Sequence, residues 1–170
     1  MRDRNGEVGF EEFFALHKDQ VLRVVLVAVG DRPLADDAVS EAFTRALRDW
    51  DQLQGHPSPV AWVVKTAFNY AHTVRRRDLR LISMGIPEAT KEDDPPTDPE
   101  LVRRVLVLPE RQRQVIALRI LLDMSTEQTA DVLGIAPGTV TAHLFRALSR
   151  IKAELSETPP SETSAKESWR

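Results

Sequence analysis

Apolar residues recur at steps of three and four through three stretches of the first half of the chain, 9–31, 35–53 and 58–79. This spacing puts them on one face of an α-helix, so we expect three amphipathic helices. Gly30 lies near the end of the first stretch and Pro33 follows it, as is typical of a helix end. The expected core residues are Phe10, Phe13, Phe14, Val21, Val24, Val25 and Ala28, then Val39, Ala42, Phe43, Ala46, Leu47 and Trp50, then Trp62, Val63, Thr66, Ala67, Tyr70 and Val74.

The starts of the second and third helices carry local signals. We expect Asp36 and Asp37 in the first turn of the second helix, because carboxylates suit the positive end of a helix dipole. Ser58 is a candidate N-cap for the third helix, and Pro59 suits its first position.

The sequence of the C-terminal half predicts two short helices followed by a long one. Pro109 is expected to begin a helix, and Ser125 with Gln128 matches a capping box at the start of the next. Gly134 would end that helix and Pro137 would begin the last one. Two helices joined by a short turn containing glycine are typical of a helix-turn-helix. The expected core residues are Val115, Ile116, Leu118, Leu122, Thr129, Ala130, Val132 and Leu133, then Val140, Leu144, Ala147 and Ile151.

Between the two halves the periodicity fails. GIPEATKEDDPPTDPE holds four prolines and six acidic residues, which indicates an extended, mobile linker. We therefore predict an all-α protein of two small domains, because glycine is scarce and β-branched runs are short. The expected units are a helical domain at 8–82, an acidic linker at 83–100, a helix-turn-helix domain at 101–155 and a disordered tail at 156–170.

Composition excludes several classes of function. The chain has no cysteine, so disulfides and thiol chemistry are excluded. It has neither an apolar stretch of membrane-spanning length nor a signal peptide, so we expect a cytoplasmic protein without membrane insertion. The four histidines lack metal-ligand spacing, and no phosphate loop or nucleophile motif occurs. We therefore expect neither an enzyme nor a bound metal or cofactor.

Charge is unevenly distributed, although the net charge is only −3. Residues 60–80 carry five basic side chains and one acidic one, and residues 101–152 carry eight and four. Such local basic segments favour nucleic acid, because fields act over only about 8–10 Å at physiological salt. A helix-turn-helix can place the exposed face of its second helix in the DNA major groove.

Three strings together identify a family. LPERQRQVIALRILLDMSTEQTADVLGIAPGTVTAHLFRALSRIKAEL resembles the C-terminal DNA-binding domain of bacterial RNA polymerase sigma factors of the extracytoplasmic-function group. GDRPLADDAVSEAFTRALRDW and PVAWVVKTAFNYAHTVRRR resemble the N-terminal domain of that group. The resemblance implies a protein that binds core RNA polymerase, directs it to promoter DNA and assists promoter opening. An anti-sigma factor is a further expected partner.

The resemblance also implies roles for residues of the first domain. Its acidic motif, which docks on the polymerase in the family, corresponds to Asp36, Asp37, Val39 and Glu41. The A-W-x-x-x-x-A-x-N pattern marks the helix that captures a base of the −10 promoter element, with the preceding loop LQGHPSP as the expected specificity element. Basic groups hold a strand and polar groups receive a flipped base. The expected contacts are Lys65, Asn69, Arg75, Arg76 and Arg77, whereas Trp62 is expected in the core.

In the second domain the resemblance implies that the last helix reads the −35 element. Thr141 and His143 replace two residues that are usually basic, and Ala136 replaces a usual serine cap. Because each phosphate contact contributes about 0.9 to the salt slope, we expect weaker, less salt-sensitive binding by this domain alone, with an altered base preference equally open. The expected contacts are Arg111, Arg113, Ser125, Thr139, Thr141, Ala142, His143, Phe145 and Arg146.

The sequence also leaves two other classes of protein to consider. GTVTAHL is also close to the output helix-turn-helix of LuxR-type and response regulators. Those proteins usually carry an α/β receiver or a ligand domain, which the helical first half disfavours. A helical scaffold that never touches DNA would leave the two basic segments unexplained.

Overall fold

The computed structural model describes residues 9–83 and 104–157, and every regular element within them is helical. The N-terminal half, residues 9–83, contains α1 (Phe10–Val29), α2 (Arg32–Arg48), α3 (Trp50–Leu53) and α4 (Pro59–Ser83). The C-terminal half, residues 104–157, contains α6 (Glu110–Ile116), a π-helical segment η1 (Ala117–Leu121), α7 (Thr126–Leu133) and α8 (Pro137–Glu157). The prediction of an all-α fold is confirmed. None of the described helices contains an apolar stretch that could cross a bilayer.

Most helix ends lie where local chemistry predicts them. α1 ends at Gly30, whose φ of +74° is the left-handed conformation that glycine tolerates. α4 begins at Pro59, and α8 begins at Pro137. Ser125 Oγ accepts from the backbone N–H of Gln128 at 3.1 Å, and the Gln128 side chain accepts from the N–H of Ser125 at 2.8 Å, so the predicted capping box is present.

The start of α2 differs from the prediction. The helix begins at Arg32, so Asp36 and Asp37 lie beyond its first turn. Asp31 is the N-cap, and its carboxylate accepts from the N–H of Leu34 at 2.8 Å. This cap satisfies a backbone donor that has no partner within the helix, and Pro33 fits the first turn because its N–H is not needed there. The helix therefore starts before the acidic pair.

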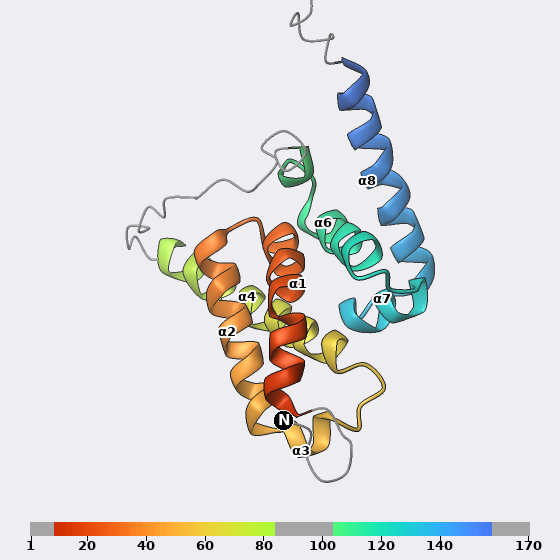
Figure 1. The fold of residues 1–170 in the computed structure, drawn as a ribbon. Helices are drawn as coiled ribbons and strands as arrows, with labels where there is room; N and C mark the ends of the chain where they lie inside the picture. Colours follow the sequence, from red (N-terminus) through yellow and green to blue (C-terminus); the bar gives the residue numbers. More distant parts are fainter. Residues whose placement is uncertain (1–8, 84–103, 158–170) are drawn as a thin grey trace, which may run out of the picture.

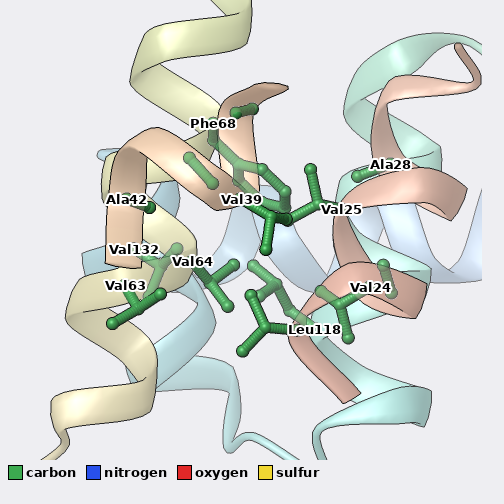
Figure 2. Packing of buried hydrophobic residues seen from close by; sticks show 14 of the residues in the cluster. Val24, Val25, Ala28, Val39, Ala42, Val63, Val64, Phe68, Leu118 and Val132 are labelled. Carbon is green, nitrogen blue, oxygen red and sulfur yellow. The ribbon is translucent and has the colours of Figure 1, made fainter. Parts of the chain in front are cut away.

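One apolar core runs through both halves of the chain. α1 lies between α2 on one side and α6 on the other, and α7 lies against α4 (Figure 1). Leu118, which is fully buried, lies among Val24 and Val64 (Figure 2). Val63 and Ala67 are buried as predicted, whereas the buried Val64 and Phe68 add a second face to α4 that periodicity did not indicate. Trp62 is only partly buried, against the edge of this core.

α8 runs along the outside of the C-terminal half (Figure 1). Val140 and Ala147 are buried, and Leu144 and Ile151 pack beside them, so the predicted stripe is confirmed. The helix extends to Glu157, two residues past the predicted end of the domain. Residues 84–100 of the predicted linker and 158–170 of the predicted tail lie outside the described residues.

Candidate functional site

The acidic residues of α2 form an exposed surface on the N-terminal half. Asp37 is exposed, and its carboxylate forms no ion pair within the described residues. Asp36 pairs with Arg32 at 3.0 Å, and Glu41 pairs with Arg45 at 2.7 Å, both one turn apart on the helix. Exposed pairs of this kind contribute only about 0.3–0.5 kcal/mol, so both carboxylates can exchange partners. Val39 lies in the core at 8% exposure and supports this surface from beneath.

A groove of about 420 Å³ runs between α1 and α2 beside these acids. Asp36 and Val39 line it on α2, and Phe14 lines it on α1. The side chain of Phe14 is 39% exposed, although periodicity placed it in the core. Leu47, also a predicted core residue, borders the groove at 56% exposure. The structure thus joins the acidic surface to an apolar groove that sequence reasoning missed.

The candidate −10 residues of α4 fall into two groups. Asn69, Arg76 and Arg77 are exposed. Lys65 is exposed as well, but it and the half-buried Arg75 contact the backbone of other helices through their charged ends. Lys65 Nζ donates to the carbonyl of Asp131 in α7 at 3.2 Å. Arg75 donates to the carbonyl of Val29 at the end of α1 and pairs with Glu110 of α6 at 3.2 Å.

Arg113, a candidate −35 residue, lies between the two halves. Its guanidinium donates to the carbonyls of Ala28 and Val29 at 3.1 and 3.2 Å, and to those of Leu106 and Leu108 at 3.3 and 2.7 Å. Burial lowers the pKa of Arg113, the nearby Arg75 lowers it further, and Glu110 opposes both. The group stays charged, because an arginine pKa lies far above neutral pH.

The other candidate −35 residues are mostly accessible. Thr139, Thr141, Arg146 and Phe145 are exposed on the outer face of α8, with Phe145 73% exposed. Ala142 is half-buried, as is His143, whose Nδ1 is shielded from solvent. Arg111 is exposed and donates to the Gln114 side chain at 3.1 Å. The Ser125 hydroxyl is engaged in the capping box, which leaves one lone pair for another donor.

The two sets of candidate DNA residues meet at one pocket. A hollow of about 350 Å³ lies between α4, α6 and α7, lined in part by Asn69 and Arg111. His72 and Glu110 also line it, and sequence reasoning assigned neither of them a role. No local pattern could have found this pocket, because its walls come from helices far apart in the sequence. Within the described residues, no group of three potential ligands could hold a metal ion.

Comparison with known proteins decides the family. The model for sigma-70 region 2 matches residues 13–80, and the model for sigma-70 region 4 matches residues 99–151. The RNA polymerase sigma-E factor of Streptomyces avermitilis is 34% identical over 157 residues, which covers 89% of this chain and 88% of that protein. The chain belongs to the sigma-70 family, in its extracytoplasmic-function group. It is a sigma factor, which directs RNA polymerase to promoters.

Other relatives agree with this assignment. The extracytoplasmic-function sigma-E factor of Escherichia coli is 33% identical over 154 residues, covering 79% of each chain. The structure of the sigma factor RpoE of Bartonella quintana, solved with the anti-sigma factor NepR, has the same fold, with a TM-score of 0.75 at 20% identity over 88% of this chain and 98% of that one. The alternative of a LuxR-type or response regulator is not favoured, because region 2 accounts for the N-terminal half. Sigma factors are initiation factors rather than enzymes.

Replacing Ser125 by alanine should lower the free energy of unfolding by about 1 kcal/mol, because the substitution leaves the backbone N–H of Gln128 without its cap. For a chain of this size the melting temperature should fall by roughly 2–4 °C. Thermal unfolding followed by far-UV circular dichroism measures the change. Thr126→Ala in the same turn is the control, since its hydroxyl forms no hydrogen bond within the described part of the chain.

Proposed function

We propose that this sigma factor uses three surfaces, which follow one another along the chain. α2 docks on core RNA polymerase, α4 captures the −10 element, and α8 reads the −35 element. The observation that carries the assignment is the 34% identity to a sigma-E factor along nearly the whole chain. Each surface has a chemistry suited to its target. None of them performs a reaction, and RNA synthesis stays with the polymerase.

The polymerase-binding surface consists of Asp36, Asp37, Val39 and Glu41. The carboxylate of Asp37 has no competing partner among the described residues, so a basic group of the polymerase can take it without breaking an ion pair. Val39 acts indirectly, because its buried side chain fixes the helix that presents the acids. The acidic side chains steer the sigma factor toward the polymerase and orient it there. The neighbouring apolar groove adds surface that a helix of the polymerase can bury.

The −10 surface consists of Lys65, Asn69, Arg75, Arg76 and Arg77. The cations of this set hold the sugar–phosphate backbone, while the Asn69 amide offers both a donor and an acceptor to a base edge. Asn69 is exposed, so its amide is accessible to a base. The loop at 53–59 lies immediately before α4 and sets which base is admitted.

The −35 surface is the outer face of α8. Thr139, Thr141 and Ala142 enter the major groove with Phe145, whose exposed ring suits a thymine methyl group. Arg146 is exposed and takes a phosphate. Arg111 and Arg113 of α6, Ser125 before α7 and His143 of α8 complete the proposed set.

We place this protein in the cytoplasm, where its polymerase and promoters are. We also propose an anti-sigma factor as a regulatory partner. The Bartonella quintana neighbour was solved with the anti-sigma factor NepR, and a second neighbour, CnrH, was solved with the cytosolic domain of CnrY.

Gel filtration of the purified protein with bacterial core RNA polymerase tests the proposal. We expect co-elution at a one-to-one ratio that is lost when a housekeeping sigma factor is added in excess. Separate elution under conditions where that housekeeping factor co-elutes would contradict the polymerase-binding assignment.

A further inference from the structure

The hollow between α4, α6 and α7 combines apolar and polar walls. Its apolar lining comes from Phe68 of α4 and from Val132 and Leu133 of α7, each at most 9% exposed. Its volume of about 350 Å³ lies at the lower end of the range for small-molecule sites, which is about 300–1,000 Å³, so it suits a ligand of mononucleotide size. The polar side chains that line it are Asn69, His72, Glu110, Arg111 and Gln114.

Two of these polar side chains are already engaged by their neighbours. Glu110 pairs with Arg75 at 3.2 Å and accepts from Gln114 Nε2 at 3.2 Å. Gln114, which is 6% exposed, also accepts from Arg111 at 3.1 Å. The Glu110 carboxylate is thus balanced by Arg75, and the positive charge of Arg111 has no ion pair among the described residues. The hollow therefore favours an anion.

Three polar groups of the lining remain available to a ligand. Asn69, His72 and Arg111 are all exposed. The side chains of Asn69 and His72 form no hydrogen bond within the part of the chain that the structure describes, and Arg111 keeps most of its N–H donors unused. A guanidinium binds a phosphate through two parallel hydrogen bonds, and an imidazole N–H can donate to another phosphate oxygen. An asparagine amide pairs with N6 and N7 of adenine.

The positions of these groups suit one ligand with a base and a phosphate. Asn69 and His72 are three residues apart on α4, so they share a helix face, with their Cβ atoms about 5–6 Å apart. Arg111 lies on α6, on another wall of the same hollow. A phosphate can therefore lie between His72 and Arg111 while the base reaches Asn69.

We propose that this hollow binds an adenine nucleoside monophosphate. The phosphate binds Arg111 and His72, and the amide of Asn69 pairs with N6 and N7 of the base. The apolar lining covers part of the base and removes it from water. Binding needs neither polymerase nor DNA, so its test does not depend on the proposed promoter contacts, although Asn69 belongs to both.

Isothermal titration calorimetry of the full-length protein with AMP tests the proposal. We expect one site with a dissociation constant of about 0.1 mM, as is reasonable for a ligand of this size. Adenosine lacks the phosphate and inorganic phosphate lacks the base, so each should bind at least about tenfold more weakly. Absence of AMP binding at millimolar concentration, or equally tight binding of inorganic phosphate or adenosine, would overturn the proposal.

Two variants test the phosphate contacts. Arg111→Ala should weaken AMP binding by about tenfold or more, because a charged contact to the phosphate is lost. The matched control is Arg150→Ala, which removes the same charge from an exposed position on α8 and should change binding by no more than about twofold. His72→Ala should weaken the binding of AMP several-fold and leave that of adenosine unchanged. Equal weakening by Arg111→Ala and Arg150→Ala would show a general effect of surface charge and overturn the site.

The base contact is tested with 7-deaza-AMP, which lacks the N7 acceptor. It should bind the unaltered protein several-fold more weakly than AMP does, and Asn69→Ala should remove that difference. Equal binding of the two nucleotides by the unaltered protein would overturn the pairing with Asn69.

Thermal unfolding gives a second readout of the same site. Any ligand that binds only the folded state stabilises it by mass action, so saturating AMP should raise the melting temperature by several degrees. The rise should be absent from the variant that carries both His72→Ala and Arg111→Ala. The same rise in that variant would contradict binding at this hollow.

Discussion

Replacing Leu118 by alanine should lower the free energy of unfolding by about 3 kcal/mol. The side chain is fully buried where η1 meets α1 and α4, and removing it leaves a cavity that packed helices close only in part (Figure 2). Because one core joins both halves, the loss should appear in a single cooperative transition. Urea unfolding of the full-length protein, followed by far-UV circular dichroism, measures it.

Ile120→Ala is the matched control for this prediction. Ile120 lies two residues further along η1 and is 60% exposed, so its truncation should change the free energy of unfolding by no more than about 0.5 kcal/mol. A loss below about 1 kcal/mol for Leu118→Ala would contradict the shared core. Two separate transitions in the unaltered protein would contradict it as well.

Replacing Asp37 and Glu41 together by alanine should weaken binding to core polymerase by about 30- to 100-fold while the protein stays folded. Asp37 has no ion pair among the described residues, and Glu41 has only an exposed pair with Arg45. Loss of these charges therefore costs the fold less than about 1 kcal/mol. In the complex, removing both carboxylates leaves the basic groups of the polymerase without their partners, which costs about 2–3 kcal/mol of binding free energy.

Fluorescence anisotropy of labelled protein titrated with core polymerase measures this change. The control is Glu11→Ala with Asp51→Ala, which removes the same charge from exposed positions on α1 and α3. The control should bind within about threefold of the unaltered protein, since distant surface charges are screened. Unchanged binding by the Asp37 and Glu41 variant, or equal weakening by the control, would contradict the assignment of α2.

The sequence by itself determined the features that depend on neighbouring residues. Gly30, Pro59 and Pro137 mark helix ends, and the capping box at Ser125 forms as predicted, because each involves contacts within about one turn of a helix. The predicted start of α2 was wrong because several nearby residues carry the same local signal. Asp31, Asp36 and Asp37 all suit a helix start, and only the folded helix shows that Asp31 caps it.

Tertiary structure alone decided which faces are covered and which charges are available. Val64 is buried beside Leu118 of η1 (Figure 2), and the buried Phe68 lines a pocket with Val132 of α7, whereas Phe14 is exposed beside an open groove. Arg75 was predicted from a basic run, yet it binds the carbonyl of a residue 46 positions away. Hydrophobic periodicity describes each helix by itself. Which faces of a helix are buried depends also on the other helices that the folded chain brings next to it.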